Sequence, residues 1–89
     1  MNKRRLDQRV ALLTGLTERQ VAAVTSTFLR LIANDLVRGE VVHLYNFGRF
    51  RMKSQSGRVR VLFLRDKFFR RLISDRFNGE TKMEKFGVD

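Results

Sequence analysis

The chain is 89 residues long and carries 19 lysines and arginines against 9 aspartates and glutamates, a formal net charge of +10. It has no cysteine and one histidine, which excludes disulfides, thiolate metal sites and histidine-rich metal sites. The length predicts one domain with a small core, and no apolar run approaches the roughly 20 residues that a membrane span needs. We therefore expect a cytosolic protein whose positive charge serves a polyanionic partner.

The first apolar pattern in the chain predicts a short helix. Leu6, Val10 and Leu13 follow one another at the spacing of a single helical face. Asn2 stands before them and is a good N-cap residue. A threonine and a glycine follow the pattern, and glycine commonly ends a helix. We therefore expect a helix over residues 3–13.

A start signal and a long apolar stripe predict a second helix. Thr17 and Gln20 have the spacing of a capping box, in which each side chain accepts a hydrogen bond from the other residue's backbone N–H. Gly39 ends the pattern, so we expect this helix over residues 18–37. Its apolar stripe consists of Val21, Val24, Phe28, Leu31, Ile32 and Leu36.

The hydrophobic period then changes from that of a helix to that of a strand. Alternation of apolar and polar residues predicts strands at 40–45, 49–53 and 58–61. Residues 46–48, Asn-Phe-Gly, suit a turn because asparagine and glycine both tolerate positive φ. Residues 54–57 make a short hairpin connection. The sequence therefore predicts a three-stranded antiparallel meander.

Helical spacing returns in the last part of the chain and predicts a helix over residues 67–77. Its expected buried stripe consists of Phe69, Leu72, Ile73 and Phe77. Residues 78–89 are polar with scattered apolar side chains, which indicates a loosely docked tail. We therefore expect one domain over residues 1–77, followed by a C-terminal tail over residues 78–89.

The positive charge is concentrated in one part of the chain. Residues 49–76 carry a net charge of +8 and the first five residues +3, whereas residues 6–48 are neutral. Along the last two strands cations alternate with apolar side chains, so the cations share one face of a hairpin. This cationic face consists of Arg49, Arg51, Lys53, Arg58 and Arg60. Like charges opposite each other destabilise a sheet, and a bound polyanion would neutralise them.

Two interpretations of the cationic face are open. Either a nucleic acid neutralises it, or it is a solvated face that keeps a sheet edge from aggregating. The second interpretation favours lysine mixed with glutamate, but no acid stands between Glu40 and Asp66. Fourteen of the 19 bases are arginines, which suit bidentate phosphate contacts better than lysines do. Composition and patterning therefore favour a nucleic acid.

Further cations stand on the predicted helices. Lys67, Arg70 and Arg71 of the last helix either contact phosphates or form an ordinary polar helix face. Lys3 and Arg4 lie in the first turn of the first helix, where the helix dipole disfavours cations. That placement slightly favours a phosphate contact. We take all five as candidate flanking contacts to DNA.

No pattern in the sequence points to an enzyme, a metal site or a cofactor. His43 has no nearby nucleophile and no carboxylate pair, so we interpret it as a strand-surface histidine. Phosphate-loop, dinucleotide-binding and paired-carboxylate motifs are absent from the sequence. The phenylalanines would suit a base-stacking platform, but their spacing fits a hydrophobic core better. We therefore expect no catalytic residue.

Several segments of the chain together have a recognisable order and spacing. Residues 46–50 read Asn-Phe-Gly-Arg-Phe, and residues 16–20 precede the long predicted helix as Leu-Thr-Glu-Arg-Gln. The opening Met-Asn-Lys and the basic, phenylalanine-rich segment 63–73 complete the set. In this order they resemble the HU/integration host factor family, whose turn reads Gly-Phe-Gly-x-Phe. The resemblance covers residues 2–75.

The resemblance implies an α+β fold: a helical hairpin, then a three-stranded antiparallel sheet and a C-terminal helix, intertwined with a second chain as a dimer. DNA would lie on the outward face of the strands. The dimer core would include Phe28, Phe47, Phe50 and Phe63. Family members also carry long β-arms whose tip proline wedges between base pairs. Only four residues stand between Lys53 and Arg58, and the chain has no proline, so the resemblance implies a member without these arms.

The sequence therefore predicts a histone-like homodimer that binds double-stranded DNA without sequence specificity. We expect it in the cytoplasm, associated with the nucleoid and condensing DNA through phosphate contacts. An alternative is an armless interaction module that forms heterodimers with a full-length HU-type protein or modulates another DNA-bound partner. A weaker alternative is an RNA partner, because the same cationic face would accept RNA.

Overall fold

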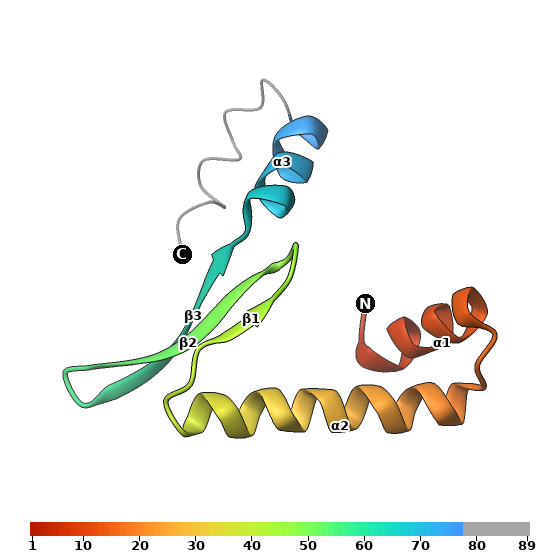
Figure 1. The fold of residues 1–89 in the computed structure, drawn as a ribbon, viewed down its shortest axis with the longest axis horizontal. Helices are drawn as coiled ribbons and strands as arrows, with labels where there is room; N and C mark the ends of the chain where they lie inside the picture. Colours follow the sequence, from red (N-terminus) through yellow and green to blue (C-terminus); the bar gives the residue numbers. More distant parts are fainter. Residues whose placement is uncertain (78–89) are drawn as a thin grey trace. The chain divides into compact units, whose positions relative to one another are not determined.

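A computed structural model describes residues 1–77 of the chain, and the tail predicted at 78–89 lies outside this range. The described part is α+β and has the predicted order of elements (Figure 1). The elements are α1 (Lys3–Thr14), α2 (Glu18–Val37), β1 (Val42–Leu44), β2 (Gly48–Gln55), β3 (Arg58–Arg65) and α3 (Lys67–Arg76). The chain divides into two compact units, with the boundary after Asn34.

The ends of the first two helices follow the predicted capping signals. The Asn2 side chain accepts a hydrogen bond from the Arg5 backbone N–H at 3.0 Å, and Gly15 ends α1 in the left-handed conformation. The Thr17 backbone N–H donates to the Gln20 side chain, and the Gln20 backbone N–H donates to the Thr17 hydroxyl, both at 3.0 Å. Both reciprocal bonds of the capping box are therefore present.

In the first unit, α1 and α2 are connected through a carboxylate. Asp7 is the one buried charged side chain of residues 1–77, and Ala11 and Val21 are buried with it. The Thr25 hydroxyl donates to Oδ1 of Asp7 at 2.8 Å, and the Lys3 ammonium donates to Oδ2 at 2.6 Å. These two bonds compensate the burial of the carboxylate, which would otherwise be costly.

The predicted apolar face of α1 is not the buried one. Leu6 and Val10 are exposed, and Leu13 is 85% exposed. The buried positions are Asp7 and Ala11, because the bond from Thr25 and the small alanine side chain define the face that meets α2. Leu6, Val10 and Leu13 therefore form an apolar face that one chain leaves exposed.

The sheet has the predicted meander topology, with strand order β1-β2-β3 and antiparallel pairing throughout. The strand β1 is shorter than the predicted 40–45, whereas β2 and β3 extend beyond their predicted ends. Ser56 and Gly57 both have positive φ, the conformation of a two-residue hairpin turn whose twist matches that of the strands. The ladder therefore continues to the pair Gln55 and Arg58, and the four-residue connection predicted at 54–57 is wrong.

Four phenylalanines form an aromatic cluster in the second unit. The Phe50 and Phe63 rings lie 4.7 Å apart between centroids, and the Phe47 ring lies 5.2 Å from Phe63 and 5.0 Å from Phe69. Phe69 belongs to α3, so the cluster joins this helix to the sheet. The Asp66 backbone N–H also donates to the Phe47 carbonyl at 2.9 Å. These contacts fix the start of α3 against the turn before β2.

Gly48 has a different role from the one predicted for it. The turn places Asn46, not Gly48, at positive φ (67°). A Cβ atom on Gly48 would overlap the Phe63 ring and would lie 2.6 Å from the Leu64 carbonyl oxygen. Gly48 is therefore required for the close approach of the aromatic cluster to the strand, because any side chain would displace it.

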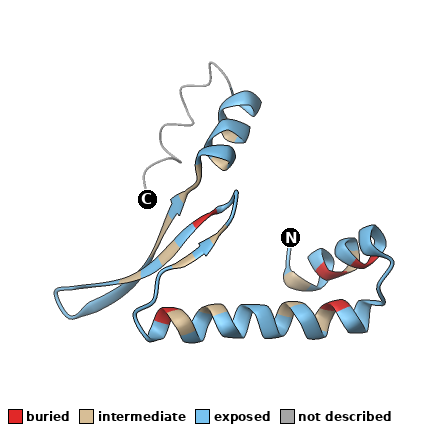
Figure 2. Cartoon of the chain, viewed as in Figure 1, coloured by how far each residue is buried: buried red, intermediate tan, exposed pale blue. Residues whose placement is uncertain are grey.

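The apolar stripes of α2 and α3 are only partly covered within one chain (Figure 2). On α2, Val21 and Leu36 are buried, but Val24 is 63% exposed, Phe28 48% and Leu31 57%. On α3 no residue is buried, which contradicts the predicted stripe. Phe69 and Ile73 are half-buried there, and Leu72 and Phe77 are exposed.

Candidate nucleic-acid interface

The ladder register decides which side chains share a face of the sheet. Directly paired residues of an antiparallel ladder point to the same side. Lys53 pairs with Arg60, Gln55 with Arg58, and Arg51 with Leu62. The cationic face defined from the sequence therefore occupies one side of the β2–β3 hairpin. Its members are Arg49, Arg51, Lys53, Arg58 and Arg60.

The five side chains that define this face are all positively charged. All five cations are exposed. None of them has a carboxylate within 4.0 Å among residues 1–77. Lys53 and Arg60 stand directly opposite each other, an arrangement of like charges that destabilises a sheet. The face therefore attracts anions, and no acid of residues 1–77 lies close enough to neutralise it.

The structure adds His43 to the cationic face and gives it a partner. His43 pairs with Arg49 across β1 and β2, so both point to the same side. Its Nε2 atom lies 2.8 Å from Oδ2 of Asp66. His43 is therefore an exposed strand residue, as predicted, but the carboxylate beside it was not foreseen. The sequence alone does not predict this contact. His43 and Asp66 come together only because the end of β3 lies level with β1 in the folded sheet.

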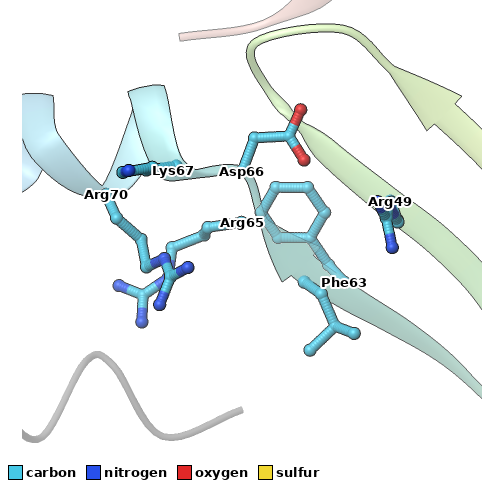
Figure 3. A pocket seen from close by; sticks show the side chains of 7 residues that line it. Arg49, Phe63, Arg65, Asp66, Lys67 and Arg70 are labelled. Atoms are coloured by element: carbon cyan, nitrogen blue, oxygen red, sulfur yellow. The ribbon is translucent and has the colours of Figure 1, made fainter.

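A pocket of about 430 Å³ lies where β3 meets α3 (Figure 3). Its lining residues are Arg49, Phe63, Leu64, Arg65, Asp66, Lys67 and Arg70. Four of these are cations, and the one acid is the partner of His43. Figure 3 shows the guanidinium ends of Arg65 and Arg70 on one side of the pocket and the Asp66 carboxylate turned away from them.

Arg65 is a pocket residue that the sequence pattern did not single out. The alternation predicts a third strand that ends at residue 61, which places Arg65 between a strand and a helix. In the structure it is the last residue of β3 and pairs with Gly48. The feature of the sequence that could have pointed to Arg65 is its position in a basic segment directly before α3.

The predicted flanking cations divide between the two units. Lys67, Arg70 and Arg71 line a second, more open hollow on the surface of α3 together with Ser74. Lys3 and Arg4 belong to the first unit. The Lys3 ammonium is engaged by the Asp7 carboxylate, so its position in the first turn of α1 already has a structural explanation. Arg4 is exposed.

Comparison with known proteins identifies the family. Residues 1–61 match the model of the bacterial DNA-binding protein family, to which HU belongs. The chain belongs to this family. No curated protein sequence matched the chain. Among residues 1–77, no helix is long and apolar enough to cross a membrane.

Solved structures of family members have the same fold. A point mutant of HU from Thermotoga maritima is 29% identical to this chain, with a TM-score of 0.76, and the match covers 82% of this chain and 99% of that one. HU from Thermotoga maritima is also 29% identical, with a TM-score of 0.70 and coverage of 82% and 98%. A cocrystal structure of Anabaena HU with DNA matches at 24% identity and a TM-score of 0.73, covering 83% and 98%. The predicted fold class, with its helical hairpin, three-stranded sheet and C-terminal helix, is confirmed.

Proposed function

We propose that this protein binds double-stranded DNA without sequence specificity and contacts the phosphate backbone through the cationic face of its sheet. The observation that carries the proposal is the register of β2 and β3, which gathers five cations on one side of the sheet. None of the five has a carboxylate of residues 1–77 within 4.0 Å. Family membership supports it, as does the DNA bound by the Anabaena relative. Within the described residues 1–77, none of the five side chains has an ion-pair partner that would direct it toward a particular base.

The binding energy would come from counterion release. A cation that neutralises a phosphate displaces a condensed counterion, and the logarithm of the binding constant falls with the logarithm of salt by about 0.9 per phosphate contacted. Arginine predominates on the face, which favours bidentate contacts with phosphate oxygens. Lys67 and Arg70, which line the pocket together with Arg49, would add contacts at the edge of this face, as would Arg71. Arg65 pairs with Gly48 and therefore points to the opposite side of the sheet.

We also propose that the protein is a homodimer. A single chain leaves Val24, Phe28 and Leu31 about half or more exposed on one stripe of α2. Phe47 is 44% exposed at the edge of the aromatic cluster. A second copy that covers these residues would bury apolar area worth about 25 cal/mol per Å². We propose one domain over residues 1–77, followed by a tail over residues 78–89. We also propose that the protein is cytoplasmic and associated with the nucleoid.

The hairpin indicates how such a dimer would hold DNA. β2 and β3 are joined by only Ser56 and Gly57, and the chain has no proline. This short connection supports the proposal that the protein has no long arms, and the sequence has no proline that could act as the wedge the family resemblance associates with intercalation. We propose that the sheet contacts the backbone and condenses DNA without wedging base pairs apart.

A salt-titrated binding assay on linear, nicked and pre-bent duplexes tests the proposal, with the molecular mass measured in the same buffers. We expect binding at low salt, a steep loss of affinity as salt rises and little dependence on sequence. Undetectable binding at low salt, or an affinity that is insensitive to salt, would contradict the proposal. Competition with structured RNA distinguishes a DNA partner from an RNA partner.

The short hairpin also favours a second candidate function. A chain that keeps the family core but has no arms would suit an interaction module that pairs with a full-length HU-type protein or another DNA-bound partner. Mixing the purified chain with an HU protein and measuring subunit composition by mass spectrometry tests this. Heterodimers would support it, whereas self-dimers with full DNA affinity would count against it.

A further inference from the structure

We infer that the pocket between β3 and α3 binds a phosphate monoester, the group found at the end of a DNA strand. This inference deepens the proposed function, since it assigns a specific ligand group to the edge of the DNA-binding surface. The pocket differs from the cationic face because it is a hollow of about 430 Å³ rather than an open sheet surface. A hollow suits a terminal group, whereas an internal phosphate continues in both directions and lies better on an open face.

The charge of the pocket matches a doubly charged ligand. Arg49, Arg65, Lys67 and Arg70 line it, and none of them has a carboxylate within 4.0 Å among residues 1–77. The guanidinium groups of Arg65 and Arg70 lie on the same side of the pocket (Figure 3). A phosphodiester carries one negative charge, but a phosphate monoester carries about 1.5 to 2 at neutral pH and offers three acceptor oxygens.

The one acid of the pocket is held by its contact with His43. Asp66 is the N-cap residue of α3, yet its side chain makes no capping hydrogen bond. Its Oδ2 lies 2.8 Å from Nε2 of His43 instead, and Figure 3 shows the carboxylate turned away from Arg65 and Arg70. The pair therefore removes a competitor for the arginines. It also leaves the first backbone N–H groups of α3 without a side-chain cap.

The first measurement compares two duplexes of one sequence that differ only in carrying a 5′-phosphate or a 5′-hydroxyl at each end. We expect about tenfold tighter binding to the phosphorylated duplex, which is the scale of charge-assisted hydrogen bonds. Arg65→Gln and Arg70→Gln should each reduce this preference, and the double variant should abolish it. Equal affinity for the two duplexes, or a preference that survives the double variant, would overturn the inference.

Two control variants separate this inference from the proposed function. Arg58→Gln lies on the cationic face outside the pocket, so it should weaken binding to both duplexes and leave their ratio unchanged. Arg19→Gln removes one charge in the first turn of α2, which belongs to the other unit. It should change neither the affinity for the two duplexes nor the ratio of these affinities. Circular dichroism of each variant checks that the fold is retained.

A titration with thymidine 5′-monophosphate decides whether the site accepts a free mononucleotide as well as a strand end, and it needs no DNA binding. Its readout is the NMR shift of the backbone amides of residues 65–70. We expect shifts there with the monophosphate and none with thymidine. If neither duplex binds, the proposed function fails while this titration still tests the pocket. If the duplexes bind equally and the amides do not shift, only the pocket inference fails.

Discussion

The Nε2 atom of His43 lies 2.8 Å from Oδ2 of Asp66, although the two residues are 23 positions apart in the chain. The contact joins β1 to the residue that precedes α3. It also directs the one carboxylate of the β3–α3 pocket toward an imidazole rather than toward the pocket arginines. The pair thus holds this carboxylate away from Arg65 and Arg70.

Substitutions in this pair should change DNA affinity in opposite directions. Asp66→Asn removes the acid, so affinity for duplex DNA at low salt should rise by about two- to fivefold, the range of a partly exposed charge interaction. His43→Ala leaves the Asp66 carboxylate without its partner and near the arginines, so affinity should fall by a similar factor. Fluorescence anisotropy measures both. The same direction of change in the two variants would contradict this role of the pair.

The cationic face makes a quantitative prediction about salt dependence. Arg51→Gln removes one candidate phosphate ligand from the middle of β2. The slope of log binding constant against log salt should become shallower by about 0.9 for each phosphate that the variant leaves without a cation. A homodimer carries the substitution in both subunits, so its slope should change by twice that amount. Arg19→Gln, which lies on α2, is the matched control and should leave the slope unchanged. An unchanged slope in Arg51→Gln would remove this residue from the interface.

The carboxylate of Asp7 makes stability depend on pH. The hydrogen bond from the Lys3 ammonium lowers the pKa of Asp7 from 3.8; burial opposes this, and the hydrogen bond from Thr25 and the charge of Lys3 add to the lowering. Because the pKa in the folded state is depressed, this contribution to stability is present above pH 3.8 and is lost as the pH falls through the lower folded value. Asp7→Asn should therefore lower the Tm at about pH 7 and have little effect at about pH 2.

Thermal unfolding followed by circular dichroism at the two pH values measures the effect of Asp7→Asn. Arg9→Gln, an exposed position on the same helix, controls for a general loss of charge from α1. An Asp7→Asn variant that is equally destabilised at both pH values would show that the carboxylate charge is not what stabilises the contact.

Gly48 should not tolerate even a methyl group. Gly48→Ala forces a Cβ atom against the Phe63 ring and the Leu64 carbonyl. The free energy of unfolding should fall by about 1–3 kcal/mol, the usual cost of overpacking. Asn46→Gly is the contrasting variant, because Asn46 holds a positive φ that glycine adopts without strain, and it should be neutral or stabilising. Urea unfolding measures both. A fully stable Gly48→Ala would mean that the cluster can move away from the strand.

The proposed dimer predicts a change in mass when the α2 stripe is altered. Phe28→Glu places a charge where a second copy would be packed, so the measured mass should fall to that of one chain of 10.5 kDa. Ser26→Glu introduces the same charge on another face of α2 and should leave the dimer intact. Light scattering after size exclusion measures both masses. A wild-type protein that is itself monomeric would contradict the proposal.

The local features of this fold were predictable from the sequence because each depends on near neighbours in the chain. The capping residues Asn2, Thr17 and Gln20 satisfy N–H groups within three positions, so the starts of α1 and α2 could be assigned without tertiary information. The alternation likewise places the cations of residues 49–53 on one face of β2 and those of residues 58–61 on one face of β3. The ladder register then brings the two sets to the same side of the sheet. The candidate cationic face is therefore largely a property of the sequence.

Contacts between residues far apart in the chain were decided by the tertiary structure alone. Thr25 makes the Asp7 side of α1 the inner one, although the leucine spacing favoured another face. Gly48 is needed for space beside Phe63 rather than for its φ. The pocket arises where Arg65 and the start of α3 meet, and His43 binds its acid. Periodicity reports which residues share a face of one element, but it does not report which element packs against that face, because that depends on the geometry of the whole chain.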